Sequence, residues 1–209
     1  SNESGISVST IEHLMSALSG MQIDNAKIFI NAPKVPIMDG SSKPFVELIE
    51  KAKTREQDCK RKIIKVLKTV EVRRKDSFVR LSPNKQFSVN FEIEFESPLI
   101  NKQSCSLQLL NGNYKSDVSS ARTFGFEKDV KGLMANGFAL GGSLDNAIVI
   151  GKESILNKEG LRFKDEFVRH KILDSIGDLY LAGYPVEGYF YGRKSGHTLN
   201  HELLKKLLS

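Results

Sequence analysis

The strict alternation of apolar and polar residues between Phe87 and Phe95 is the feature that most constrains the fold. Phenylalanine, valine and isoleucine take every second position, and polar residues lie between them. Successive side chains of a strand point to opposite faces, so this segment is predicted to be a half-buried antiparallel strand. The chain must therefore build a sheet and cover one face of it.

Other segments are typical of strands and helices on both sides of this one. Further strands are predicted at 26–30, 63–72, 77–81, 104–110, 147–150 and 186–193. Helices are predicted at 10–20, 44–52, 128–135, 163–183 and 196–208. The first helix should begin at a capping box, because Ser9 and Glu12 have the S-x-x-E spacing. The polar stretch 55–62 is predicted to be a linker.

Composition limits the classes of protein that fit. The chain has 209 residues, 40% of them hydrophobic, and its two cysteines do not form a CxxC pair, so we expect a folded protein of a reducing, cytoplasmic compartment. Its apolar runs are far shorter than the roughly 20 residues that span a bilayer. The net charge of +6 is compatible with a basic surface or an anionic ligand. Acidic residues interrupt the cationic stretch 51–75, which also lacks aromatic residues, and this favours an exposed surface over nucleic-acid binding.

Three polar residues, His170, Asp174 and Asp178, recur four apart in the predicted helix 163–183. At 3.6 residues per turn they form a stripe on one face, beside the apolar Phe167. A histidine and an aspartate at this spacing can bind one metal ion together. An exposed polar face or a local ion pair is the alternative interpretation.

Two other histidines are candidates for the same site. His13 follows Glu12 at the start of a predicted helix, where it would supply the third protein ligand of a catalytic zinc site, although it could equally be a half-buried structural residue. His197 lies where a strand is predicted to turn into a helix, and a capping or surface role is its alternative. No role is assigned to His201.

Six segments, in order along nearly the whole chain, closely resemble the UDP-3-O-acyl-N-acetylglucosamine deacetylases, zinc enzymes of lipid A synthesis. The segments are STIEHLMSALSG at 9–20, NAPKVPIMDGSSKPFVELI at 31–49, ARTFGF at 121–126, LGGSLDNAIVI at 140–150, LRFKDEFVRHKILDSIGDLYLAG at 161–183 and KSGHTLNHELL at 194–204.

The resemblance implies an α+β fold of two β-α-α-β sandwich domains packed face to face, with zinc between them. Residues 1–57 would form part of the first domain, with one ligand helix and the general base. Residues 60–209 would form the second domain, with the acyl groove, the other ligand helix and the general acid. Members of the family carry a strand-rich segment ahead of the first matching block, so the first domain is expected to be truncated at its N-terminus.

The resemblance also implies a role for each candidate site residue. The zinc ligands would be His13, His170 and Asp174, with Fe²⁺ as an alternative metal. Glu12 would be the general base and Thr123 the oxyanion donor. His197 would be the general acid, and Asp178 would orient it. Lys171 would contact the nucleotide phosphates and Phe124 the sugar. Leu140 and Gly142 would belong to an acyl groove built by residues 133–150.

The implied reaction is hydrolysis of the N-acetyl group of UDP-3-O-acyl-N-acetylglucosamine with release of acetate, an early committed step of lipid A synthesis. The enzyme is expected to be a cytoplasmic monomer that binds no nucleic acid and does not insert stably into membranes. A basic nucleic-acid or membrane-surface module, and a catalytically inactive homologue or fragment, are the alternatives.

Overall fold

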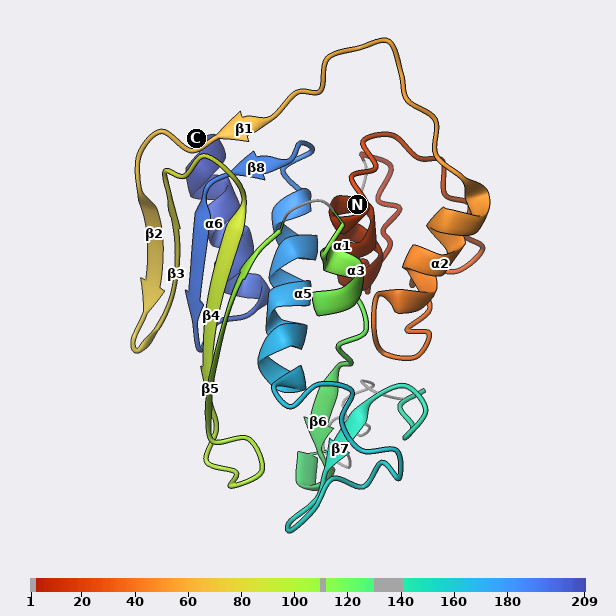
Figure 1. The fold of residues 1–209 in the computed structure, drawn as a ribbon, viewed down its shortest axis with the longest axis vertical. Coiled ribbons are helices and arrows are strands. Elements are labelled where there is room, and N and C mark those ends of the chain that lie inside the picture. Colours follow the sequence, from red (N-terminus) through yellow and green to blue (C-terminus); the bar gives the residue numbers. More distant parts are fainter. Residues whose placement is uncertain (1–2, 110–111, 130–140) are drawn as a thin grey trace.

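A mixed five-stranded sheet, in the order β2-β3-β9-β4-β5, forms one side of the molecule (Figure 1). The computed structural model describes residues 3–109, 112–129 and 141–209. The strands are β2 (Val70–Arg74), β3 (Ser77–Ser82), β4 (Ser88–Glu94), β5 (Lys102–Gln108) and β9 (Tyr189–Arg193). The expected combination of sheets and helices is therefore present.

Strand β4 is the alternating segment that the sequence marked most clearly. Val89, Phe91 and Ile93 are buried on its inner face, as predicted. It pairs antiparallel with β5 but parallel with β9, so the antiparallel prediction holds for only one of its edges. The reason is that β9 follows a long helical connection and returns to the sheet in the same direction as β4.

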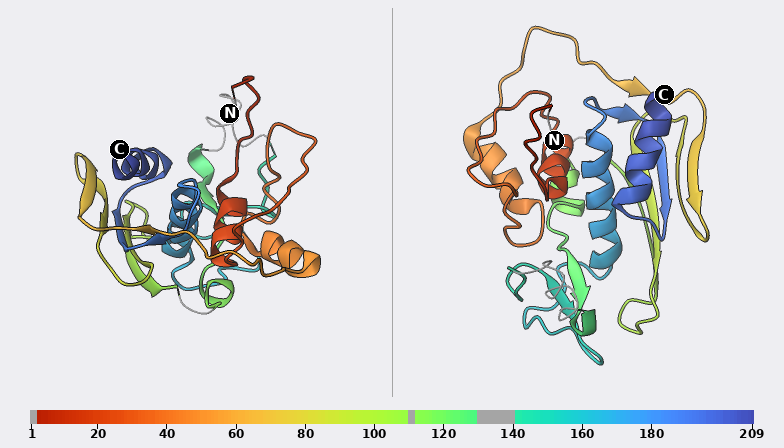
Figure 2. Two further views of the ribbon diagram at one scale, coloured as in Figure 1. Left: turned by 90° about the horizontal axis from the view of Figure 1, so that it is seen from above. Right: turned by 180° about the vertical axis from the view of Figure 1, so that it is seen from behind.

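Four helices are layered over the inner face of this sheet. Helices α5 (Glu166–Tyr180) and α6 (His197–Leu208) contact the strands directly. Helix α1 (Glu12–Gly20) packs on α5 on the side away from the sheet, and α2 (Lys43–Ala52) packs on α1. Seen from above in Figure 2, the sheet, α5, α1 and α2 follow one another across the molecule. Helix α5 is therefore covered on both sides.

Two small parallel sheets complete the described structure. One pairs β1 (Ile64–Lys65) with β8 (Val186–Glu187), and the other pairs β6 (Phe124–Phe126) with β7 (Ile148–Ile150). The predictions of single strands at 63–72 and 186–193 were wrong, because each segment is divided between two sheets. The second division falls at Gly188, where an added Cβ would lie 2.8 Å from a methyl carbon of Val66. A short helix, α3 (Tyr114–Asp117), precedes β6.

The predicted strand at 26–30 is absent. These residues pair with no strand within the described structure, and Phe29 is 93% exposed. An apolar segment forms a strand only where another strand pairs with its backbone hydrogen-bonding groups. A single bridge between Ser9 and Lys34 is the only strand-type pairing among residues 3–57 that the structure describes.

The capping box was also wrong, although α1 begins near the expected residue. Its N-cap is Ile11, and no side chain caps it. Both the backbone N–H and the hydroxyl of Ser9 instead donate to the carbonyl of Pro33. The predicted helix at 128–135 mostly lies outside the described residues, since only 128 and 129 of it are described, and they are helical.

The buried apolar residues form one continuous cluster, which joins Ala17 and Phe45 to Ile172 and Ile176. It therefore draws on both predicted domains, and the division at 57–60 stays a prediction. As predicted, 55–62 contains neither helix nor strand. No helix in the described part of the chain is long and apolar enough to cross a membrane.

Helices α1 and α5 approach each other closely at Gly177. A Cβ at this position would lie 2.1 Å from the carbonyl oxygen of Glu12 and 3.1 Å from the backbone nitrogen of Ser16. Both atoms belong to the backbone of α1, so they can move only if the helix moves. The glycine therefore sets the separation of the two helices.

We expect Gly177→Ala to destabilise the protein although alanine is the better helix former. The gain in helix propensity is about 1 kcal/mol, whereas forcing a methyl group into a packed contact typically costs about 1–3 kcal/mol and here displaces a helix. Chemical denaturation should show a net loss of stability. Gly125→Ala is the control, because an added Cβ there meets no atom within 4 Å. Equal stability of the two variants would contradict the close approach.

Candidate metal centre

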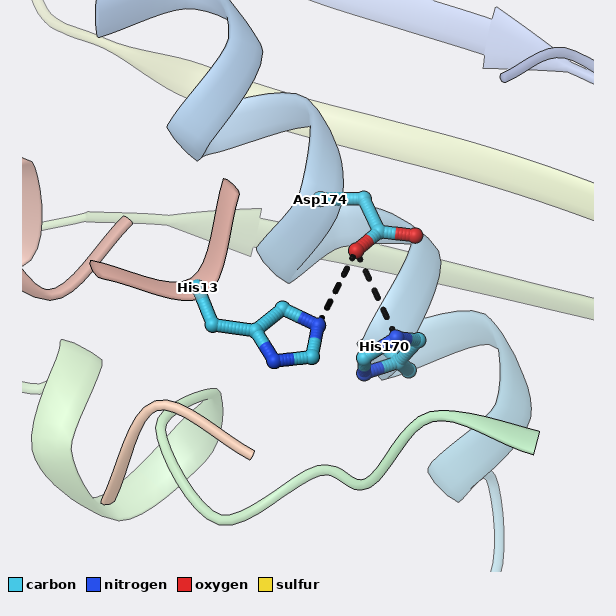
Figure 3. Close-up of side chains that lie close together, drawn as sticks. All are labelled: His13, His170 and Asp174. Carbon is cyan, nitrogen blue, oxygen red and sulfur yellow. Dashed lines mark ion pairs between the residues drawn. The ribbon is translucent and has the colours of Figure 1, made fainter. Parts of the chain in front are cut away.

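Three buried side chains from two helices converge where α1 crosses α5. Figure 3 shows His13 on α1 and His170 and Asp174 on α5 pointing toward one another. The Oδ1 atom of Asp174 lies 3.7 Å from Nε2 of His13 and 3.4 Å from Nε2 of His170. All three potential ligand atoms lie within 4.8 Å of one another, so they can hold one metal ion.

The orientation of His170 suits a metal ligand. Its Nδ1 lies 3.0 Å from the carbonyl oxygen of Ala121. A carbonyl can only accept, so Nδ1 carries the hydrogen and the lone pair of Nε2 faces Asp174. Burial lowers the pKa of His170 to about 3, and the ring is therefore neutral at physiological pH. Neutral imidazole is the form that binds metals.

Asp174 supplies the negative charge of the cluster. Burial by itself raises the pKa of its carboxyl group, but the positive charge of Lys171 and the neighbouring hydrogen-bond donors outweigh that effect and hold the pKa well below its ordinary value. The ammonium of Lys171 donates to Oδ2 at 2.7 Å. The other oxygen, Oδ1, is left facing the two imidazoles. Two imidazole nitrogens and one carboxylate oxygen form a donor set that zinc accepts.

The imidazole of His13 is positioned mainly by packing. Its ring meets that of His170 edge to face, with centroids 5.0 Å apart. Its Nδ1 is buried and has no hydrogen-bond partner within the described residues. The hydroxyl of Ser42 donates to the His13 carbonyl at 2.7 Å, which ties this residue of α1 to the start of α2.

Lys171 and Phe124, the predicted substrate contacts, lie beside the cluster. The Lys171 ammonium is 5.7 Å from the centre of the Phe124 ring. That ring is in turn 6.4 Å from the ring of His170. The structure therefore gathers both residues at the metal centre.

A second polar cluster surrounds Asp178, one turn further along α5. Its carboxylate accepts hydrogen bonds from Nδ1 of His197 at 2.8 Å and from the side-chain amide of Asn200 at 2.8 Å. The hydrogen bond to Asp178 raises the pKa of His197 to about 9, although partial burial opposes the shift. His197, the first residue of α6, is therefore protonated at neutral pH because its pKa is about 9.

His201 is a contact that the sequence interpretation missed. Its Nε2 lies 3.3 Å from Oδ1 of Asp178, so one carboxylate faces two imidazoles. The signal was present in the sequence, because His197 and His201 are four residues apart on one helix and so share a face.

The remaining predicted site residues have no such direct contacts. Glu12 is the half-buried first residue of α1, directly before His13, and Thr123 directly precedes β6. Within the described residues no hydrogen bond or ion pair links either side chain to the metal cluster. Gly142 is exposed, and Leu140 lies outside the described residues. The predicted roles of these residues stay predictions.

We expect His197 to stay protonated up to about pH 9. Its pKa is raised in the folded state, so the contact with Asp178 stabilises the protein fully below the unfolded value of about 6.5. That contribution disappears as the pH rises through about 9. An NMR titration of the imidazole should show the raised pKa, and Asp178→Asn should lower it toward 6.5. In the control His201→Asn, the pKa should stay well above 6.5. Titration of His197 near 6.5 in the unchanged chain would contradict the assignment.

Comparisons with known proteins agree with this geometry. The family model for UDP-3-O-acyl N-acetylglycosamine deacetylase matches residues 2–209. This chain is 51% identical to a protein named UDP-3-O-acyl-N-acetylglucosamine deacetylase from Psychrobacter cryohalolentis, over 98% of this chain and 65% of the relative. It is 47% identical to a protein of the same name from Neisseria meningitidis, over 99% of this chain and 68% of the relative. The chain thus spans about two thirds of the length of these relatives. By the match over almost its entire length, the chain belongs to the UDP-3-O-acyl N-acetylglycosamine deacetylase family.

Proposed function

We propose that this chain carries the catalytic residues of a zinc-dependent deacetylase, which hydrolyses the N-acetyl group of UDP-3-O-acyl-N-acetylglucosamine and releases acetate. The observation that carries the proposal is the convergence of His13, His170 and Asp174 from distant parts of the chain. The names of the relatives support the substrate. The alternative of a basic nucleic-acid module is not favoured by the family match.

The donor set favours zinc, with Fe²⁺ as the alternative metal. Catalytic zinc sites typically have three protein ligands and one open position, and nitrogen with carboxylate oxygen is a common combination. Zinc bound there supplies a Lewis acid and a water molecule of lowered pKa. The neutral imidazole of His170 and the ionised carboxylate of Asp174 need lose no proton to bind it.

Glu12 is proposed as the general base. It directly precedes His13 on α1, so its carboxylate is anchored next to a metal ligand. In this role it takes a proton from the attacking water. The hydroxyl of Thr123 would donate a hydrogen bond to the acetamide oxygen as negative charge develops on it.

His197 is proposed as the general acid. Asp178 keeps its imidazole protonated at neutral pH and fixes its direction through Nδ1. The other nitrogen, Nε2, is then available to give its proton to the departing amine. Asn200 also donates to Asp178, which holds the carboxylate in place.

The surface beside His197 suits the anionic part of a nucleotide sugar. A hollow there is lined by the first residues of α6 and by two cations already paired with carboxylates, Arg74 with Glu202 and Lys194 with Asp76 and Glu94. Free N–H groups at the start of a helix favour anions. We propose that the nucleotide diphosphate lies near this hollow and Lys171, with the sugar against Phe124.

Gly142 and Leu140 remain proposed for the acyl groove, and the enzyme is proposed to act as a cytoplasmic monomer.

Zinc content tests the metal centre directly. We expect about one tightly bound zinc ion per chain by elemental analysis, and we expect Asp174→Asn to lose most of it because the site loses its only anionic ligand. Asp165→Asn is the control, since that carboxylate pairs with Arg169 and not with the cluster. Zinc retained equally by both variants would exclude Asp174 as a ligand.

Acetate release from UDP-3-O-acyl-N-acetylglucosamine tests the general base. We expect Glu12→Gln to retain zinc and to lose about 10²–10⁴-fold in turnover, the usual contribution of a positioned base. Glu47→Gln is the control, because this residue is exposed on α2, where it pairs with Lys43. If the unchanged chain binds zinc but releases no acetate, it is instead a homologue or fragment that only binds.

A further inference from the structure

A buried ion pair, Arg122 with Glu166, lies beside the metal centre and has no part in the proposed reaction. Arg122 is 1% exposed and Glu166 is fully buried. The guanidinium contacts both carboxylate oxygens, with Nε at 2.9 Å from Oε1 and Nη2 at 3.3 Å from Oε2. The backbone N–H of Arg122 also donates to Oε1 at 3.0 Å. Glu166 therefore fixes both the side chain and the backbone of Arg122.

The pair joins three segments of the chain. Beyond Glu166, the guanidinium of Arg122 contacts Glu159 at 2.6 Å and donates to the carbonyl of Gly160 at 2.7 Å. The backbone N–H of Arg162 donates to the other oxygen of Glu166. The residues before β6, the loop at 159–162 and the first turn of α5 are thus held together by one network.

Arg122 lies between a residue that contacts the metal centre and two residues with proposed roles there. Ala121, directly before it, offers the carbonyl that accepts the Nδ1 hydrogen of His170. Thr123 and Phe124, directly after it, are the proposed oxyanion donor and sugar contact. Because adjacent peptide units are rigid, a backbone fixed at Arg122 restricts the positions of its neighbours.

Stability alone is a weak explanation for this pair. Burying two charges carries a large desolvation cost, and apolar residues of similar volume often stabilise a protein equally well. What a bidentate pair adds is direction, because the planar guanidinium matches a carboxylate in one geometry.

We infer that Arg122 and Glu166 are positioning residues of the metal centre. Through the backbone of residues 121–124 they hold the Ala121 carbonyl against His170, and so orient Nε2 toward the shared metal. The inference rests on the proposed function, because it assumes that His170 binds the metal. Partners that orient a histidine ligand typically change metal affinity by about 10–100-fold when they are lost.

Zinc affinity, measured by competition with a chromophoric chelator, tests this inference. We expect Glu166→Gln and Arg122→Lys to weaken zinc binding by about 10-fold or more. Lysine keeps the charge but cannot form the two parallel bonds. The matched control is Asp165→Asn, the same change of carboxylate to amide at the adjacent residue. Asp165 pairs with Arg169, which anchors α5 to the carbonyl of Asp117 instead of to residues 121–124. We expect the control to change zinc affinity less than 3-fold.

A second measurement does not depend on the metal. In the metal-free chain, NMR should detect the hydrogen-bonded Nδ1–H of His170, and this signal should weaken or move in Glu166→Gln but not in Asp165→Asn. Folded variants with unchanged zinc affinity and an unchanged His170 signal would overturn the inference. An unchanged chain that binds no zinc would refute the proposed function instead, while the NMR comparison would still test the positioning role.

Loss of the buried pair could unfold the protein, so a milder variant is included. Glu159 contacts the same guanidinium, but its side chain is 56% exposed. We expect Glu159→Gln to fold and to weaken zinc binding by about 2- to 5-fold, less than the loss of a full orienting partner. If the buried variants do not fold, unchanged zinc affinity in Glu159→Gln overturns the inference.

Discussion

The close packing of α1 on α5 is the contact on which the rest of the site depends. Gly177 permits it, because any larger residue would meet the backbone of α1. One turn earlier on α5 lies Asp174, and two turns earlier lies His170, so the same crossing brings His13 to both. Because Gly177 has no side chain, α1 packs close enough to α5 for three potential ligands from the two helices to share one ion.

Buried charge is concentrated around α5, and each group has a partner of suitable chemistry. Asp174 faces Lys171 and two imidazoles, Asp178 faces His197 and Asn200, and Glu166 faces Arg122. The three carboxylates have different consequences. Asp174 leaves one oxygen facing two imidazoles, Asp178 keeps a neighbouring imidazole charged, and Glu166 holds the backbone of Arg122. Their different surroundings on one helix separate these roles.

The sequence predicted best the features that depend on local periodicity. The alternation at 87–95 and the stripe of His170, Asp174 and Asp178 both reflect the repeat of one element, and both are confirmed as geometry. Periodicity was insufficient where a partner decides the outcome. Residues 26–30 have the composition of a strand but pair with no strand in the described structure, and Ser9 bonds to Pro33 instead of capping α1. Which helices meet at the metal centre could not be derived from spacing, and came from the family resemblance.

Helix α5 also acts as a rigid spacer between two parts of the chemistry. Asp174 and Asp178 are four residues apart, so the rise of an α-helix sets their separation along the axis at about 6 Å. Helical pitch therefore sets the distance between the proposed metal ligand Asp174 and the carboxylate that contacts His197. A motion that carried α1 away would open the metal cluster while the spacing between the two aspartates stayed the same.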